Sequence, residues 1–147
     1  MSNASAPDTR SIHTLTFAGA QSLIQAAVAA AQEQSMAVSV ALHDTGANLV
    51  GFARMDGAPA LTIDIAQNKS YTAVAFGLPT HQWHDVLKDD EPLKLGIVHT
   101  PRLVTYGGGY PIVSDGQIVG SIGISGGHYT QDMTVAEAAL KACGFAQ

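Results

Sequence analysis

Two pairs of apolar segments, each joined by a tight turn, constrain the fold of this 147-residue chain most strongly. Asp115-Gly116 stands between two apolar runs, and both residues tolerate the positive φ angles that a hairpin turn requires. Asp44-Thr45-Gly46 separates two earlier segments in which apolar and small or polar residues alternate. The pattern therefore predicts two β-hairpins, with strands at residues 37–43, 48–54, 110–114 and 117–125, and a fifth strand at residues 102–106.

Between and around these strands, apolar residues recur at steps of three and four, which predicts helices. Thr16 can cap the first helix, and Gly77 with Pro79 can end the second. Thr80 is the expected cap of a short third helix whose inner face carries Trp83, Val86 and Leu87. The predicted helices cover residues 16–31, with Phe17 on the apolar stripe, and residues 61–76, 80–88 and 130–143.

The order of these elements favours an α+β class, with a mainly antiparallel sheet of about five strands flanked by helices. Hairpins replace the strand–helix–strand alternation of a parallel sheet, and the sequence contains no GxGxxG or Walker motif. Neither a repeat nor a linker interrupts the pattern, so residues 12–147 are expected to form one domain. Residues 1–11 have neither a basic start nor an apolar centre, so they are interpreted as a loose tail and not as a signal peptide.

Composition narrows the classes of partner. The net charge of −5 comes without a basic cluster, which argues against nucleic acid. No stretch of about 18 apolar residues exists, so a membrane span is not expected, and the protein is predicted to be cytoplasmic. Only 13% of residues are charged while 46% are hydrophobic, and this surplus predicts a buried interface in a homo-oligomer. The single cysteine, Cys143, is interpreted as a small apolar helix residue.

Two glycine-rich segments are the strongest candidates for a binding site. Gly107, Gly108 and Gly109 interrupt a β region, and Gly126-Gly127 ends the last strand just before His128 and a helix. Glycines let a ligand or another backbone approach closely, and amides at a helix start can bind an anion. The alternatives are a wide loop or bulge at the first segment and close helix packing at the second.

Three longer segments of the sequence resemble a known family. The segments FARMDGAPALTIDIAQNKSYTAVAFGLPT, GGGYPI and GSIGISGGHYTQDMTVAEAAL occur in this order and resemble the GlcG/HbpS-like family of haem-binding or haem-degrading proteins, over residues 15–144. The resemblance implies a profilin-like or PAS-like fold and assembly into dimers and larger rings, commonly octamers. Members include a haem-binding partner of a redox sensor, C-terminal domains of corrinoid adenosyltransferases and proteins from catabolic gene clusters.

The resemblance also carries over positions that hold ligands or fix turns. Arg54 and Lys69 are expected to donate charged hydrogen bonds to carboxylates such as haem propionates. Their alternative role is a salt-bridge network with Asp56 and Asp64. The remaining positions carried over are Asp56, Gly57, Asp64, Gln67, Gly107 to Gly109, Pro111, Gly126-Gly127 and Gln131-Asp132, and Asp64 is expected to contact the ligand.

The histidines and tyrosines extend this list of candidates. His81 and His84 lie three residues apart on a predicted helix, where both imidazoles can face one metal, although two ligands do not complete a zinc site. The alternative is that both histidines are exposed or pack against neighbouring residues. His99 and His128 are candidate axial ligands for haem iron, with hydrogen-bonded loop roles as the alternative. Tyr106 and Tyr110, which bracket the glycines, are candidates for iron ligation, acid catalysis or stacking on a flat ligand.

Three functions stay open at the level of sequence. The first is an oligomeric haem-binding or haem-degrading protein, in which the iron carries the chemistry. The second is an enzyme acting on a small carboxylate or carbonyl metabolite oriented by Arg54 and Lys69. The third is a binding or scaffold module without catalysis. No nucleophile elbow, carboxylate pair or Cys/His pair decides among them.

Overall fold

The computed structural model describes residues 7–145 and contains four strands in one antiparallel sheet, in the order β2-β1-β4-β3. The strands are β1 (Ser39–Asp44), β2 (Leu49–Arg54), β3 (Gly109–Ser114) and β4 (Gln117–Ser125). Both predicted hairpins are present, as β1–β2 and β3–β4, and β4 pairs with β1 to join them. Residues 1–6 of the predicted tail, and the last two residues of the predicted domain, lie outside the described range.

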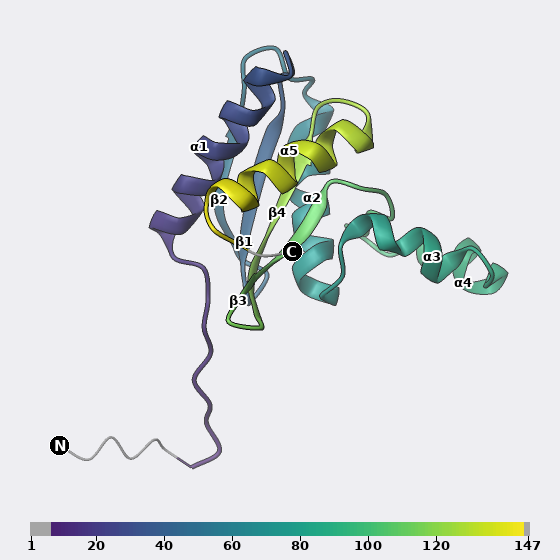
Figure 1. The fold of residues 1–147 in the computed structure, drawn as a ribbon. Helices are drawn as coiled ribbons and strands as arrows, with labels where there is room; N and C mark the ends of the chain where they lie inside the picture. Colours follow the sequence, from purple (N-terminus) through teal and green to yellow (C-terminus); the bar gives the residue numbers. More distant parts are fainter. Residues whose placement is uncertain (1–6, 146–147) are drawn as a thin grey trace.

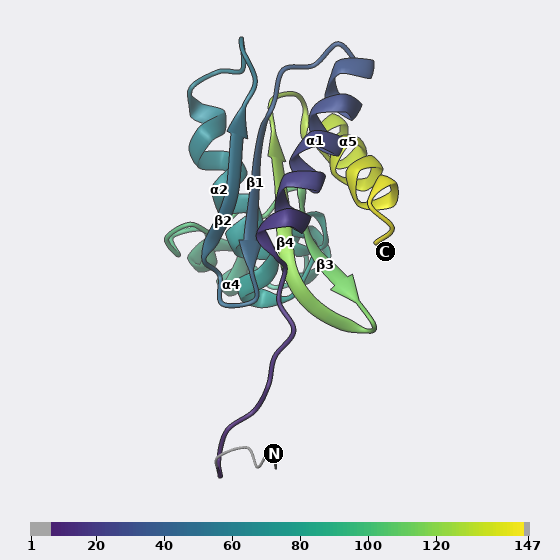
Figure 2. The same cartoon turned by 90° about the vertical axis from the view of Figure 1, so that its left-hand side faces the viewer.

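Helices cover both faces of the sheet (Figures 1 and 2). Helices α1 (Phe17–Glu33) and α5 (Tyr129–Ala142) lie on one face, and α2 (Leu61–Phe76) lies on the other. A 3-10 turn, η1 (Thr80–Gln82), leads into α3 (Trp83–Leu87) and α4 (Glu91–Ile97), which extend away from the sheet in Figure 1. The α+β class is confirmed, and no described helix is long and apolar enough to cross a membrane.

The main apolar core fills the space between the sheet and the α1/α5 pair. Val40 and Leu42 of β1 and Ile122 and Ile124 of β4 point into it and are fully buried. The N-terminal cap of α1 is Thr16, as predicted, because its hydroxyl accepts from the Gly19 amide at 3.0 Å. Phe17, predicted on the buried stripe, is instead 67% exposed, and Leu15 from the preceding segment enters the core.

The predicted fifth strand at residues 102–106 is wrong. Arg102 has a φ of 66°, which breaks an extended run, and no residue of the segment pairs with the sheet. The segment lies on α2 instead, because the Thr72 hydroxyl donates to the Arg102 carbonyl at 3.0 Å and accepts from the Val104 amide at 3.0 Å. Side-chain hydrogen bonds to a helix thus replace the expected ladder.

Helix α4 was not predicted, because Asp89-Asp90-Glu91-Pro92 was interpreted only as the end of the preceding helix. In the structure the same residues also start a helix: the Asp90 carboxylate accepts from the Leu93 amide at 3.1 Å, and proline is tolerated in a first helical turn. Two details of the preceding helix also differ from prediction. Val86 is 44% exposed, and Thr80 makes no cap hydrogen bond.

Candidate functional site

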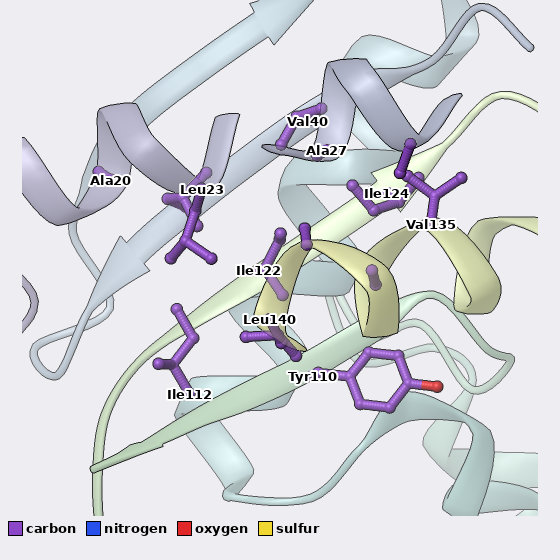
Figure 3. Packing of buried hydrophobic residues seen from close by; sticks show 14 of the residues in the cluster. Ala20, Leu23, Ala27, Val40, Tyr110, Ile112, Ile122, Ile124, Val135 and Leu140 are labelled. Atoms are coloured by element: carbon purple, nitrogen blue, oxygen red, sulfur yellow. The ribbon is translucent and has the colours of Figure 1, made fainter. Parts of the chain in front are cut away.

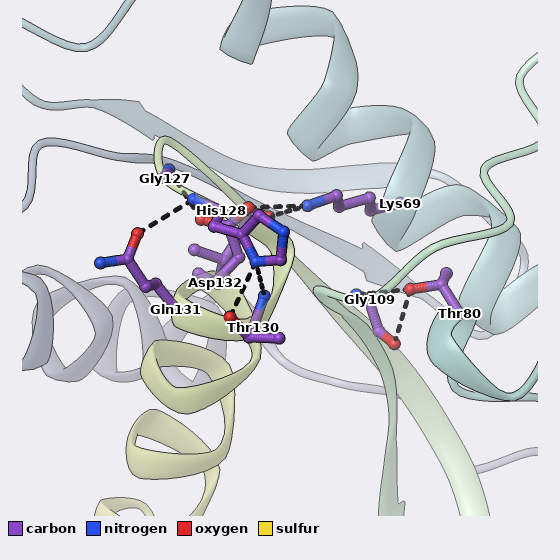
Figure 4. A network of polar contacts seen from close by, with 9 residues as sticks. Lys69, Thr80, Gly109, Gly127, His128, Thr130, Gln131 and Asp132 are labelled. Atoms are coloured by element: carbon purple, nitrogen blue, oxygen red, sulfur yellow. Dashed lines mark hydrogen bonds and ion pairs between the residues drawn. The ribbon is translucent and has the colours of Figure 1, made fainter.

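A buried ion pair lies beneath both glycine segments (Figure 4). Lys69, from the middle of α2, is 1% exposed, and its Nζ donates to Asp132 Oδ2 and to the Ile124 carbonyl, each at 2.9 Å. Asp132, in the first turn of α5, also accepts from the Gly127 amide at 3.0 Å through Oδ1. Burial lowers the pKa of Lys69, and the charge of Asp132 opposes that shift. The pair therefore joins α2, the end of β4 and the start of α5.

The first glycine segment packs tightly over this pair. A Cβ on Gly108, whose φ is 124°, would lie 2.5 Å from Lys69 Nζ. A side chain on Gly109 would overlap the Lys69 carbonyl oxygen, and one on Gly107 would overlap the Met133 sulfur. The Gly109 amide and carbonyl also bond the Thr80 hydroxyl, at 2.9 and 3.4 Å. The space that these glycines leave is therefore filled by the chain's own α2, α5 and η1.

The second segment shows the same close packing. A Cβ on Gly126 would overlap the Ala37 carbonyl oxygen, and one on Gly127 would lie 2.6 Å from Gln131 Oε1. The structure thus brings the two glycine segments together around Lys69 and Asp132, as Figure 4 shows for Gly109 and Gly127. Of the predicted glycines, Gly107 is the one that also borders an adjoining surface hollow.

That hollow, which we call the histidine–tyrosine hollow, has a volume of about 290 Å³ and is lined by His81, His84, Thr105, Tyr106, Gly107 and Tyr129. It brings together two predicted histidines, one predicted tyrosine and one predicted glycine, from η1, α3 and the loop before β3. The ring centroids of Tyr106 and Tyr129 lie 6.5 Å apart, and Lys69 Nζ lies 5.2 Å from the Tyr106 centroid. Within the described residues, His81 Nδ1 is buried without a hydrogen-bond partner.

The two tyrosines that bracket the glycines differ in environment. Tyr106 is 44% exposed at the hollow, whereas Tyr110 is buried beneath His81, with ring centroids 5.6 Å apart. The Tyr110 hydroxyl donates to Glu137 Oε1 at 2.6 Å. Burial raises the pKa of both phenols, and nearby Asp132 and Glu137, respectively, raise them further. Both tyrosines are therefore neutral phenols at pH 7.

His128 caps α5 and lies beside the hollow without lining it. Its Nδ1 is 2.8 Å from the Thr130 hydroxyl, its backbone amide donates to Gln131 Oε1 at 3.0 Å, and its ring centroid is 4.3 Å from that of Tyr129. His99 follows α4, and its backbone amide donates to the Gly96 carbonyl at 3.2 Å. The described residues contain no cluster of three or more His, Cys, Asp or Glu that could hold a metal ion.

Two predicted ligand positions, Arg54 and Asp64, do not line this hollow. Arg54 is exposed at the end of β2, where its Nε donates to the Ala58 carbonyl at 2.9 Å and fixes the following turn. Asp64 is exposed in the first turn of α2. The alternative salt-bridge network of Arg54 and Lys69 with Asp56 and Asp64 is wrong for the described residues, because Lys69 pairs with Asp132 and Arg54 bonds the Ala58 carbonyl.

Sequence reasoning missed four residues of this region: Thr105, Tyr129, Met133 and Thr80. Tyr129 and Met133 lie one turn apart at the start of α5, next to His128 and Asp132, so an i, i+4 spacing could have placed them on one face. Thr80 carried no such signal, because its hydroxyl bonds a backbone 29 residues away.

A model of the family described as "Haem degrading protein HbpS-like" matches residues 15–141. This chain belongs to the HbpS-like family. Among curated HbpS-like relatives, it is 37% identical to an uncharacterized 15.0 kDa protein from the dhaT–dhaS intergenic region of Citrobacter freundii, over 88% of this chain and 92% of that protein. It is 36% identical to the corrinoid adenosyltransferase PduO of Salmonella typhimurium, over 87% of this chain but 38% of PduO.

Solved structures of HbpS-like proteins share the fold. The crystal structure of a PduOC:heme complex superposes with a TM-score of 0.83 at 34% identity, covering 90% of this chain and 97% of that one. A double mutant of HbpS from Streptomyces reticuli gives a TM-score of 0.85 at 30% identity, covering 98% and 97%. Haem binding is therefore present among structural neighbours of this chain.

Proposed function

We propose that this HbpS-like chain is a homo-oligomeric haem-binding protein and that the histidine–tyrosine hollow receives the haem. The observation that carries the proposal is His81 Nδ1, which is buried without a hydrogen-bond partner among residues 7–145 and lies beside His84 at a surface hollow. A buried nitrogen without a partner costs about 1–3 kcal/mol, which a bound ligand would recover. The family, and the haem complex of a structural neighbour, support the choice of ligand.

The residues at the hollow fit haem in three respects. Imidazole is a common axial ligand of haem iron, and His81 and His84 are the available donors. The rings of Tyr106 and Tyr129 offer faces for a flat macrocycle. An adjoining hollow of about 340 Å³ shares His84 and Thr105 and contains Lys88 and Lys94, whose ammonium groups suit propionate carboxylates.

When bound, haem would supply the redox chemistry of its iron, and the chain would supply the setting. The Tyr106 phenol, kept neutral by its raised pKa, can donate a hydrogen bond to a polar group of a ligand in the hollow. Lys69 Nζ, which is paired with Asp132, lies 5.2 Å from the centroid of the Tyr106 ring and supports that ring without lining the hollow.

The size of the hollow supports assembly as part of the same proposal. A volume of about 290 Å³ lies at the lower limit of ligand pockets, so a haem would project beyond it and require a second wall. The neighbouring arm, formed by α3 and α4, exposes Val86, Leu93, Leu95 and Val98 by 36–64%, and α4 buries none of its residues. Burial of these side chains against another copy would both stabilise an oligomer and cover the hollow.

Hemin titration of the full chain tests this function. We expect a saturable, shifted Soret band that loses at least tenfold in affinity in His81→Ala, because an axial ligand bond is removed. Arg54→Ala, which changes a residue outside the hollow, should titrate like the wild type. An unshifted Soret band would overturn the proposal, and a stable oligomer in native mass spectrometry without any hemin response would favour the scaffold function instead.

A further inference from the structure

A second hollow, which we call the tryptophan hollow, lies on the α2 side of the η1–α3 segment. Its volume is about 250 Å³, and it is lined by Tyr71, Thr72, Ala75, Phe76, Trp83, Ile97, Thr100, Pro101 and Leu103. Trp83 is the only tryptophan of the chain and is 2% exposed, with its ring centroid 4.7 Å from that of Phe76. Its Nε1 is buried without a hydrogen-bond partner within residues 7–145. The hollow shares no lining residue with the histidine–tyrosine hollow.

A cation stands at the rim of this hollow. Arg102 lies between Pro101 and Leu103, which both line the hollow, and its guanidinium carbon is 3.8 Å from the centroid of the Tyr71 ring. Its Nε donates to Asn68 Oδ1 at 3.3 Å. No ion pair joins Arg102 to a carboxylate within the described part of the chain. The guanidinium is thus oriented by an aromatic face and an amide, while its charge lacks a counterion there.

The positive charge of Arg102 affects the pKa of a buried histidine, His43. His43 on β1 is 1% exposed, and its ring centroid is 6.3 Å from that of Tyr71. The pKa of His43 is lowered to about 4, mainly by burial and secondly by the positive charge of Arg102, while the charge of Asp44 has a smaller, opposing effect. A carboxylate bound at Arg102 would offset part of that positive potential.

We propose that the tryptophan hollow binds a small organic carboxylate, with a single ring or a short chain in the hollow and the carboxylate on Arg102. An apolar cavity of about 150 Å³ holds benzene, so 250 Å³ suits one ring with a short substituent. The planar guanidinium can hold a carboxylate through two parallel hydrogen bonds. The charged group selects acids over neutral molecules of the same shape, and the site goes beyond the haem function proposed above.

Trp83 makes the proposal directly testable by fluorescence in the full chain. Phenylacetate and 2-phenylethanol share the ring but differ in charge. We expect both to give a saturable change in Trp83 emission, with phenylacetate binding roughly tenfold more tightly at low salt. Arg102→Gln should remove the difference by weakening phenylacetate alone. The matched control Lys141→Gln removes one positive charge from α5, on the opposite face of the sheet, and should preserve the difference.

A second measurement follows His43. Phenylacetate should raise the pKa of the His43 imidazole, followed by NMR, in the wild type but not in Arg102→Gln. Equal affinities of the two probes, or no saturable response to either, would overturn the proposal. A third outcome would also overturn the proposal: Trp83 emission that changes when the oligomer is diluted and dissociates, but does not change when either probe is added. The hollow would then be a contact between subunits. Arg102→Gln should leave the hemin titration unchanged, so the two proposals fail separately.

Discussion

The two faces of the sheet carry different types of side chain. On the α1/α5 face, large aliphatic side chains such as Leu23, Ile122 and Leu140 pack together in an apolar core (Figure 3). On the α2 face, the sheet contributes small or polar residues, and hydrogen bonds join it to the helix. Ser39 bonds Thr62 at 2.9 Å, and His43 bonds Ser70 at 2.7 Å.

This difference explains where the candidate sites lie. An aliphatic core is close-packed and offers no donors, whereas a polar interface holds charges and hydroxyl groups that can be aimed at a neighbouring surface. Lys69, Tyr71 and Thr72 all come from α2, and they support the glycine loop and line or fix the tryptophan hollow. The aliphatic core supplies stability, and α2, together with Tyr129 and Asp132 at the start of α5, supplies the arrangement from which we infer function.

The largest expected effect comes from the buried ion pair, which joins α2 to the start of α5. Asp132→Ala leaves the Lys69 ammonium buried without its counterion, so the free energy of unfolding should fall by about 3–5 kcal/mol in urea denaturation. Lys88→Ala is the matched control, because the Lys88–Asp85 pair is exposed and should contribute less than about 1 kcal/mol. The double variant Lys69→Met/Asp132→Leu should recover much of the loss. Equal losses in Asp132→Ala and the double variant would mean that packing, and not charge, holds this site.

The α1/α5 face was largely predictable from sequence, and the α2 face was not. Alternation of Val38, Val40 and Leu42 with smaller residues locates strand β1 and its buried face. The α2 face gives no such signal, because Ser39, His43 and Ser121 are equally common at a surface. Their burial depends on partners 23–51 residues away, which no local pattern encodes.

The candidate site shows the same limit. Chemistry and family resemblance pointed to the glycines, Lys69 and the histidines. The buried environment of Lys69 and the separation of Arg54 from the hollow follow from the tertiary arrangement alone. The missing strand at residues 102–106 has the same origin, because Thr72 attaches that segment to α2.

The second prediction concerns acid sensitivity of the α2 face. The Ser121 hydroxyl donates its hydrogen to the Ser70 carbonyl, so in the contact between the two hydroxyl groups the Ser70 hydroxyl is the donor. Because the Ser70 hydrogen is then used, Ser70 Oγ accepts a hydrogen bond from His43 Nδ1. The pKa of His43 is lowered from 6.5 to about 4, mainly by burial. Below pH 6.5 His43 is protonated in the unfolded chain but stays neutral in the folded chain until about pH 4. The free energy of unfolding should therefore fall by about 3 kcal/mol between pH 6.5 and 4 and then level off.

Urea denaturation at pH 7, 6, 5 and 4 measures this dependence. His43→Gln should lose the part of the decline that belongs to this residue. Leu140→Ala, on the other face, should instead shift the whole curve down by about 2–5 kcal/mol without changing its slope. Parallel curves for the wild type and His43→Gln would show that the imidazole does not carry the acid sensitivity.

The smallest expected effect tests how closely α2 approaches the sheet. A Cβ on Gly123 would overlap the Ala66 carbonyl oxygen and lie 2.6 Å from the Ser70 amide nitrogen, both backbone atoms of α2. Gly123→Ala should therefore push the helix away and cost about 1–3 kcal/mol of unfolding free energy. Gly96→Ala in α4 is the matched control, because no atom lies within 4 Å of its added Cβ and alanine favours helix. That control should be neutral or stabilise by up to about 1 kcal/mol. Since the displaced helix carries Lys69 and Tyr71, Gly123→Ala should also weaken the binding of both hemin and phenylacetate. Unchanged binding of both ligands would show that neither hollow depends on the close contact of α2 with the sheet.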